Sequence, residues 1–598
     1  MWEFTGLDDV NTGRTVTARW VLTWKEGDNN GPPVAKARLV LRGFADPDLG
    51  NLDTNSPTAT RQSRLLLLGI APTTGWSLVI GDVKAAFLSG AEFERKIIVK
   101  LPADCNPLLG ASSQGGPVHM RLLKSAYGLA DAPLLWWKEA DRRLTGLGWT
   151  RHRLDKAMYM LIGRDGICAA LVLHVDDMLI AYDEKSVMVV DNLVRMRKMF
   201  NFGKWTCLDN NKSLFYCGGK LTRNGNAYTL DFEEYVKKIC PLTVEKGRNL
   251  DEKLNERDVS KVRGMIGALQ WPAGQGMPAL AASVSVQAGM LATGTVSLLH
   301  ELNKTSRFAK KASETKLNAR PFGKNLSDLC MVAFSDAAFA TRHDNSSQGG
   351  VVICLCNKSV LNGDLVDYGI ISWRSFKLPR VCRSSLSAES QACTAAADEL
   401  LMMKTFLSLM VDPEQDPRDS RTAKWICESA LVIDAKALYD MVKKTGWASG
   451  SPDKRVAIEV EMLREEIERL GCKWMWVSSE RQLADGMTKL SARQAMLDQL
   501  ASGRLRLKAD VDYIAAKKKT KEDREKDSKD AVGGRLHGRY GSAIAEKIAT
   551  VVAVASCAQG ADAASDPQMD ESASGLPWMT IITLVLLFIG GIATGAFT

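Results

Sequence analysis

The stretch that most constrains how this chain can fold is AALVLHVDDMLIAY, at residues 169–182. Two short apolar runs rich in β-forming residues flank an adjacent pair of acids, Asp176 and Asp177. This pattern predicts two strands joined by a tight turn, with the two carboxylates at its tip. Adjacent carboxylates repel each other and are costly to bury unless a cation lies beside them. An ordinary acidic turn is the alternative interpretation, because Asp is common in turns.

A third carboxylate in a similar setting, Asp82, lies in WSLVIGDVKAAFLSG at residues 76–90. It follows the apolar run Leu78–Ile80, which indicates the end of a core strand entering a turn. Three carboxylates that converge at strand ends can hold two Mg²⁺ ions and support in-line phosphoryl transfer. Together the three acids favour a metal-dependent site over an ordinary turn.

Several motifs in this part of the chain resemble, in the same order, those of reverse transcriptases from copia-type retrotransposons. GDVKAAFLSG and the VDD turn are similar to motifs A and C of that family. The other similar stretches are ARWVLTWK (18–25) and AKARLVLRGF (35–44) for the fingers, SPTATRQ (56–62) for the connector, and LLKSAYGLADAPLLWW (122–137) for motif B. The resemblance covers roughly residues 15–495 and is far more specific than a single motif match.

The resemblance implies a nucleotidyl-transfer site in the first part of the chain. It makes Asp82, Asp176 and Asp177 the catalytic ligands of two Mg²⁺ ions, with Mn²⁺ as an alternative. It also implies that basic residues of the fingers contact the incoming triphosphate and the template. We favour Lys36 and Arg38 for that role, because a guanidinium offers a fork to phosphate oxygens and an ammonium offers a point charge.

Three further residues are candidates for binding the nucleotide. Phe87 lies five residues after Asp82, where the family has an aromatic ring that blocks a ribose 2′-hydroxyl, so the resemblance implies a preference for deoxynucleotides. Burial of Phe87 in the core is the alternative interpretation. Tyr127 and Gly128, in motif B, are the other two expected substrate-binding residues.

The chain departs from the family at four positions close to these motifs. Motif B usually reads YGLKQAPR, and here Ala130, Asp131 and Leu134 replace its Lys, Gln and Arg. The loss of an amide and two cations weakens the contacts expected with nucleotide and template. His174 stands where the family usually has Tyr, and a neutral His can still pack and donate one hydrogen bond.

A second set of acids, Asp336, Glu389, Asp434 and Asp485, follows later in the chain. Their segments are MVAFSDAAFA (331–340), SSLSAESQACTAAADELL (384–401), ALVIDAKALYDMV (430–442) and LADGMTKL (483–490). A strand-end Asp, a helix Glu, a second strand-end Asp and a late Asp resemble a ribonuclease H-like site of the copia type. The resemblance makes these four acids the catalytic ligands of two further Mg²⁺ ions. No histidine lies near Asp485, where cellular members of that fold often have one. A helix cap or a surface acid is the alternative for each residue taken alone.

Other stretches predict secondary structure directly. Residues 15–45 predict two strands of a hairpin, and residues 213–240 predict a hairpin with an Asn-Gly turn followed by a helix. The apolar run Leu65–Ala71 predicts a core helix that ends at Pro72. Residues 255–310 are helical in pattern and resemble the thumb and connection of the family.

The length of 598 residues predicts about three to five domains. The expected fold class is α+β: a right-hand polymerase, then an α/β ribonuclease H-like domain, a linker and one C-terminal transmembrane helix. The boundaries are 1–204 for fingers and palm, 205–327 for thumb and connection, 328–500 for the nuclease, 501–577 for the linker and 578–598 for the helix.

The last segment, WMTIITLVLLFIGGIATGAFT, has 21 residues without a charge, which is long enough to span a bilayer. Basic residues precede it and the N-terminus resembles no signal peptide, so we expect a cytoplasmic-facing protein anchored by a single-pass helix. A read-through tail that never inserts is the alternative. The 13 cysteines show no paired or zinc-ligand spacing, which favours free thiols in a reducing compartment.

The expected function is RNA-directed DNA synthesis coupled to ribonuclease H cleavage of the RNA strand. The partners it implies are an RNA template, a DNA primer, an RNA–DNA hybrid and deoxynucleoside triphosphates, and the oligomeric state stays open. The net charge of +9 permits a polyanionic partner without requiring one. The alternative is a catalytically decayed, membrane-tethered remnant that binds nucleic acid. The sequence shows no aspartic-protease motif and no integrase zinc set, so it resembles the downstream part of a polyprotein.

Overall fold

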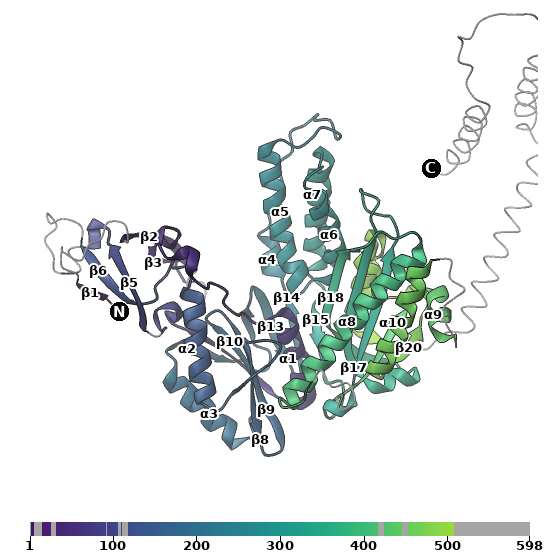
Figure 1. The fold of residues 1–598 in the computed structure, drawn as a ribbon, viewed down its shortest axis with the longest axis horizontal. Helices are drawn as coiled ribbons and strands as arrows, with labels where there is room; N and C mark the ends of the chain where they lie inside the picture. Colours follow the sequence, from purple (N-terminus) through teal and green to yellow (C-terminus); the bar gives the residue numbers. More distant parts are fainter. Residues whose placement is uncertain are drawn as a thin grey trace, which may run out of the picture. The chain divides into compact units, whose positions relative to one another are not determined.

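A computed structural model of the chain describes residues 2–4, 15–25, 31–90, 92–105, 109, 118–416, 424–444 and 453–507. They belong to one compact unit, Met1–Asp510. This part of the chain contains four β-sheets and the helices that pack on them (Figure 1). Helices and strands alternate irregularly along the sequence, as expected for the predicted mixed fold.

The first sheet has the strand order β1-β6-β5-β2-β3. Its strands are β1 (Trp2–Phe4), β6 (His119–Lys124), β5 (Glu92–Lys100), β2 (Thr15–Lys25) and β3 (Val34–Leu41). Strands β2 and β3 pair antiparallel, with Val21 opposite Arg38 and Thr23 opposite Lys36. The predicted hairpin is confirmed, and the strand alternation puts Lys36 and Arg38 on one face of it.

The second sheet is antiparallel throughout and carries the first carboxylates. Its order is β11 (Phe202–Cys207), β4 (Ser77–Val83), β10 (Asp177–Tyr182), β9 (Gly166–His174), β8 (Met158–Gly163) and β7 (Thr150–Arg151). Alternate residues of the central strands β4, β10, β9 and β8 enter two separate cores. Helices α2 (Ala132–Gly146) and α3 (Val187–Met199) cover one face, and α1 (Arg61–Thr74) covers the other. Burial on both faces explains the near-continuous apolar runs of β9 and β10.

Helix α1 corrects one prediction, because it does not end at Pro72. Thr60 caps its N-terminus by accepting a hydrogen bond from the Ser63 N–H. Pro72 lies inside the helix, which continues to Thr74 and closes at Gly75 with φ of 69°. A proline in the last turn removes only one hydrogen bond, and the left-handed glycine after it supplies the actual stop.

The third sheet has the order β12 (Ser213–Tyr216), β13 (Gly219–Asn224), β14 (Ala227–Asp231) and β15 (Leu317–Ala319). The β13–β14 loop is Gly225–Asn226, one residue later than the predicted Asn-Gly turn, with Gly225 at φ of 60°. The helices of this region are α4 (Glu233–Lys237), α5 (Glu256–Gln275), α6 (Ala281–Gly289) and α7 (Val296–Ala312). They confirm the helical pattern predicted for residues 255–310.

The fourth sheet has the order β20-β19-β16-β17-β18-β21. Its strands are β16 (Leu329–Ala338), β17 (Gln348–Asn357), β18 (Val366–Lys377), β19 (Glu428–Ile433), β20 (Lys473–Trp476) and β21 (Arg504–Leu505). Strand β17 pairs antiparallel with both β16 and β18. Strand β19 runs parallel to β16, and β20 runs parallel to β19. β21 pairs with β18, so this sheet includes residues that we had assigned to the linker beginning at 501.

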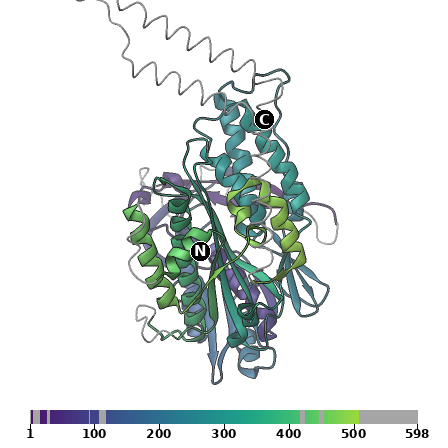
Figure 2. The same ribbon diagram turned by 90° about the vertical axis from the view of Figure 1, so that its right-hand side faces the viewer.

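The helices around this sheet are α8 (Ser385–Val411), α9 (Lys436–Lys443), α10 (Lys454–Leu470), α11 (Asp485–Thr488) and α12 (Arg493–Ser502). Helix α8 packs on β16 and β17, and α10 packs on α8; the turned view in Figure 2 shows these green helices beside the strands. Ser384 caps α8, so Glu389 lies in its second turn, and its predicted place on a helix is confirmed.

Helix α1 is joined to this fourth sheet by a half-buried arginine, Arg61. The Arg61 guanidinium lies 4.3 Å from the Trp373 ring and donates to the Trp373 carbonyl oxygen at 2.7 Å. It also donates to the Gly274 carbonyl of α5 at 3.1 Å. One hydrophobic core continues through all three elements.

Among the described residues, no helix is both long and apolar enough to cross a membrane. The predicted transmembrane helix, residues 578–598, and nearly all of the predicted linker lie outside the described ranges. The membrane anchor therefore stays a prediction.

Candidate active sites

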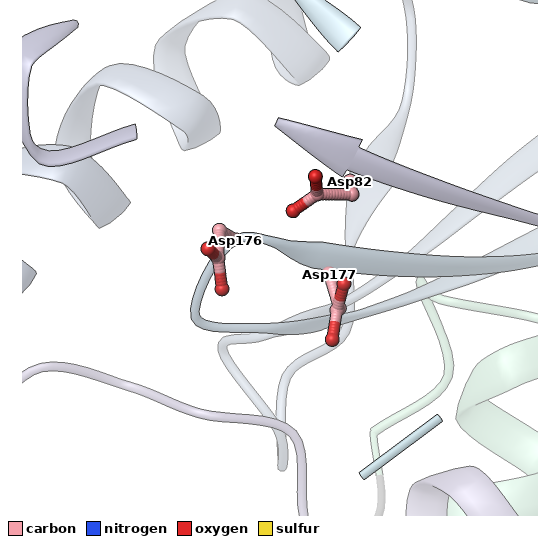
Figure 3. Close-up of side chains that lie close together, drawn as sticks. All are labelled: Asp82, Asp176 and Asp177. Atoms are coloured by element: carbon pink, nitrogen blue, oxygen red, sulfur yellow. The ribbon is translucent and has the colours of Figure 1, made fainter. Parts of the chain in front are cut away.

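Asp82, Asp176 and Asp177 meet where β4 ends beside the β9–β10 hairpin (Figure 3). One carboxylate oxygen from each lies within 4.8 Å of the others. Asp177 is directly opposite Asp82 in the antiparallel register of β10 and β4, and the Val83 N–H donates to the Asp176 carbonyl at 2.9 Å. The predicted convergence of these three acids is confirmed. Such a set of hard oxygen donors fits Mg²⁺ or Mn²⁺.

The turn that presents these acids is strained. Val175 adopts φ of 59°, a left-handed conformation that is rare for a β-branched residue. The indole N–H of Trp136 in α2 donates to the Val175 carbonyl at 2.6 Å and holds the turn in place. Strain of this kind persists only where the surroundings compensate for it, and it is frequent at functional sites.

The electrostatics of the cluster also fit a cation. Burial and the neighbouring charges of Asp176 and Asp82 raise the pKa of Asp177 to about 6. Although Asp176 is exposed, partial desolvation by the protein around the turn raises its pKa, with Asp82 contributing. The three carboxylates repel one another when charged, and a divalent ion between them would offset this repulsion.

The candidate substrate residues surround this cluster. Lys36 is close enough to lower the pKa of Asp176, and Arg38 acts in the same way on Tyr127, whose pKa is raised overall by burial. The Tyr127 and Phe87 rings form an edge-to-face pair with centroids 5.7 Å apart. Phe87 is half-buried and also packs against the core, so its two interpretations are compatible here. Its contact with a nucleotide stays a prediction.

Gly128 has a clear packing reason for being glycine. Its φ is 96°, and a Cβ atom there would lie 2.0 Å from the Leu41 carbonyl oxygen of β3. The Leu41 N–H donates to the Tyr127 carbonyl at 2.7 Å. Motif B thus adjoins the fingers hairpin through its backbone, which brings Tyr127 close to Arg38. The predicted role of Gly128 in binding substrate stays untested.

The departure at Asp131 forms an ion cluster that the sequence reading missed. The Arg95 guanidinium donates to Asp131 at 2.7 Å and to Asp46 at 2.6 Å. All three residues are largely buried, with side chains 17%, 8% and 1% exposed for Arg95, Asp131 and Asp46. The acid that replaces the usual amide is therefore paired with protein and has a structural partner.

Two other departures from the family motifs, Leu134 and His174, form no ion pair among the described residues. Leu134 is buried at the start of α2. His174 is half-buried, and desolvation together with Arg64 lowers its pKa. His174 is therefore neutral at pH 7, as assumed for a residue that replaces Tyr.

Asp336, Asp434 and Asp485 form a second cluster, again with one oxygen from each within 4.8 Å of the others. Asp336 is buried near the end of β16, Asp434 follows β19, and Asp485 begins α11. The parallel register of β16 and β19 brings the first two together. Gly350 lies opposite Asp336, and a Cβ atom there would lie 2.5 Å from Met487, so this glycine lets α11 approach.

Glu389 lies beside this cluster without joining its closest three. Burial, followed by the charges of Asp336 and Asp434, raises its pKa to about 9. One of its carboxylate oxygens is buried without a hydrogen-bond partner. An orphaned acid next to three carboxylates fits a further metal ligand, and carboxylate oxygens suit Mg²⁺ or Mn²⁺.

The sequence reading also missed two residues in contact with this cluster. The Lys489 ammonium lies 2.8 Å from Asp485 and 3.2 Å from Asp336, and the Thr488 hydroxyl donates to Asp336. Both residues lie in LADGMTKL. The four-residue spacing of Asp485 and Lys489 was a usable signal, because such residues face each other on a helical turn.

Comparisons with known proteins find similarity to reverse transcriptases and to transposon Pol polyproteins. Residues 3–246 match the family model described as reverse transcriptase (RNA-dependent DNA polymerase). The Pol polyprotein of transposon RE1 from Arabidopsis thaliana is 24% identical over 500 residues, 80% of this chain and 31% of that protein. The Pol polyprotein of transposon TNT 1-94 from Nicotiana tabacum is 23% identical over 80% of this chain and 35% of its own length. A foamy viral protease–reverse transcriptase, solved in complex with double-stranded DNA, covers 76% of this chain and 64% of its own with 10% identity and a TM-score of 0.41.

The chain therefore carries a reverse transcriptase domain. Over four-fifths of its length it is a homologue of the Pol polyproteins of copia-type transposons, which confirms the resemblance drawn from its motifs. It spans about a third of the length of these curated relatives.

Proposed function

We propose that this chain is an RNA-directed DNA polymerase whose second carboxylate cluster cleaves the RNA strand of RNA–DNA hybrids. The observation that carries the first activity is the convergence of Asp82, Asp176 and Asp177 within the domain that matches the reverse transcriptase family. The second activity is supported by the order of strands around Asp336 and by the neighbouring Asp434, Asp485 and Glu389.

In the first site the reaction joins the primer 3′ oxygen to the α-phosphorus of a deoxynucleoside triphosphate and releases pyrophosphate. Two Mg²⁺ ions, when held by the three acids, supply Lewis acidity at the attacking and leaving oxygens. Lys36 and Arg38 would bind the triphosphate, because ammonium and guanidinium groups suit phosphate oxygens. Phe87, supported by Tyr127, would pack against the sugar and exclude a 2′-hydroxyl.

In the second site the reaction adds water across a phosphodiester bond of RNA and frees a 3′ oxygen. Asp336, Asp434, Asp485 and Glu389 would hold the two cations. The raised pKa of Glu389 suits a group that loses its proton only when a cation or substrate arrives. The two sites need different substrates, because one orients a 3′ hydroxyl and the other orients water.

The test is primer extension on a labelled RNA template by the full chain with Mg²⁺, following primer and template in one reaction. We expect extension together with template cleavage. Asp176→Asn should abolish extension and leave hybrid cleavage, and Asp336→Asn should do the reverse. Asp209→Asn, which removes an exposed acid paired with Lys212, is the matched control and should change neither activity.

Full extension by Asp176→Asn would rule out the proposed polymerase site. Cleavage by Asp336→Asn would rule out the proposed nuclease site. The absence of both activities from a folded wild-type chain would favour a decayed remnant. We retain the cytoplasmic-facing C-terminal membrane anchor, at residues 578–598, as a separate proposal from hydropathy. It is tested by flotation of the full chain with vesicles against a chain that ends at residue 577.

A further inference from the structure

We propose that Lys489 is a resident cation of the second carboxylate cluster and competes there with the divalent metal. The cluster then fills with metal at a higher concentration than the first one does. This inference rests on the proposed nuclease site. It concerns how Lys489 affects the binding of the metal, and it gives Lys489 no direct part in catalysis.

The geometry gives Lys489 the position of a counter-ion. Its ammonium nitrogen contacts two of the three clustered acids, Asp485 at 2.8 Å and Asp336 at 3.2 Å. The carboxylate oxygens of the cluster lie within 4.8 Å of one another, so a group that bridges two of them occupies space next to any metal ion. Lys489 therefore neutralises two of the three carboxylates that a metal would need.

The backbone holds Lys489 in this position. It is the C-cap of α11, and its N–H donates to the Asp485 carbonyl at 2.9 Å. The Thr488 hydroxyl, next in the chain, donates to Asp336. Gln482, just before α11, donates to the Ser335 carbonyl at 2.9 Å. These contacts attach the whole segment to β16, so the ammonium stays near Asp336 in the folded protein.

The ammonium remains displaceable. The Lys489 side chain is 39% exposed, whereas that of Asp336 is 1% exposed. A partly exposed ion pair contributes modestly, because water screens it. The cluster holds three aspartates against this one ammonium, so it keeps a net negative charge that attracts a divalent ion.

The first cluster provides the contrast within the same chain. In the part of the chain that the structure describes, no lysine or arginine forms an ion pair with Asp82, Asp176 or Asp177. Lys36 lowers the pKa of Asp176 without such a contact. Among the described residues, none is placed to compete with a divalent ion there as Lys489 is in the second cluster. Synthesis would thus proceed at metal concentrations at which cleavage is still weak.

The experiment measures Mn²⁺ binding by calorimetry on the full chain, in a background of Asp176→Asn and Asp177→Asn that silences the first cluster. Lys489→Met should lower the dissociation constant of the remaining site about fivefold, the effect of removing one partly exposed charge pair of about 1 kcal/mol. Without metal, Lys489→Met should also lower the melting temperature, and Mn²⁺ should restore it. Lys489→Arg keeps the charge and should bind Mn²⁺ as the parent does.

The matched control is Lys237→Met, which breaks another Lys–carboxylate pair with four-residue spacing, Lys237 and Glu233 in α4. It should leave Mn²⁺ affinity unchanged. If Lys489→Met does not fold, Lys489→Gln serves instead. Unchanged or weaker Mn²⁺ binding by the neutral variants, while Asp336→Asn abolishes binding, would overturn the role of Lys489 alone. Absence of Mn²⁺ binding from every variant would overturn the nuclease site itself and this inference with it.

Discussion

Arg95 donates to Asp131 at 2.7 Å and thereby joins strand β5 to the residue that precedes helix α2. The same guanidinium also binds Asp46. Asp131 stands where the family usually has Gln, and its partner lies 36 residues earlier in the chain. A substitution that looked like a loss of nucleotide contact is, in the folded protein, half of an ion pair between the first sheet and motif B.

We predict that Arg95→Met destabilises the protein by about 3 kcal/mol, because it leaves two largely buried carboxylates without their cation. Asp131→Asn should cost less, about 1–2 kcal/mol, because Arg95 keeps Asp46. Urea unfolding measures both. The control is Arg151→Met, which breaks a partly exposed pair with Asp141 and should cost about 1 kcal/mol. Equal costs for the three variants would contradict the buried network.

Gly128→Ala tests the backbone contact between motif B and β3. A Cβ atom would lie 2.0 Å from the Leu41 carbonyl, at a φ of 96°. We expect a loss of about 3 kcal/mol from the clash and the strained conformation together. Gly225→Ala, at φ of 60° with open space around it, isolates the conformational part and should cost about 1 kcal/mol. Thermal unfolding compares the two, and similar losses would show that the contact is loose.

Phe87→Val tests sugar selection. A smaller side chain removes the edge-to-face contact with Tyr127 and opens the space expected to meet a 2′-hydroxyl. The ratio of ribonucleotide to deoxynucleotide incorporation should rise at least about tenfold in single-nucleotide extension. Phe215→Val, on an exposed strand of the third sheet, should leave the ratio unchanged. An unaltered ratio in an active Phe87→Val enzyme would leave Phe87 as a core residue only.

His152 makes stability depend on pH. Burial lowers its pKa to about 4, against about 6.5 in an unfolded chain. Its Nδ1 accepts from the Leu154 and Asp155 N–H groups, and its Nε2–H donates to the Phe406 carbonyl at 3.1 Å. A proton on Nδ1 would point at these two N–H groups and would remove the acceptor that they share. The folded state therefore binds the proton less well than the unfolded chain does.

The contribution of His152 is consequently complete above about pH 6.5 and is lost as the pH falls toward 4. Between pH 7 and pH 5 we expect a loss of about 2 kcal/mol that is absent from His152→Gln. Urea unfolding across this range measures the difference between the two proteins. Parallel pH curves for wild type and His152→Gln would rule out this role.

Elements whose hydrogen bonds close within a few residues were predictable. The two apolar runs of residues 169–182 indicated strands β9 and β10 and put Asp176 and Asp177 at their turn. The same holds for the β2–β3 hairpin and for the start of α8 before Glu389. Pro72 was misread because the rule against proline describes helix interiors, whereas the last turn tolerates it.

Contacts between distant segments were not predictable from local patterns. Lys489 meets Asp336 across 153 residues, and the glycine that permits this approach, Gly350, is on a third segment. Nothing in the sequence around Lys489 identifies its second partner. The register of β16, β17 and β19 decides it.

The sequence by itself therefore determined the chemical inventory: seven acids in order, the strands and helices that carry them, and a family whose motifs they match. Only the tertiary structure decided which charges neutralise one another, including Arg95 with Asp131 and Lys489 with Asp336. The physical reason is range. Periodicity and capping act over about four residues, whereas an ion pair depends on where packing brings two surfaces together.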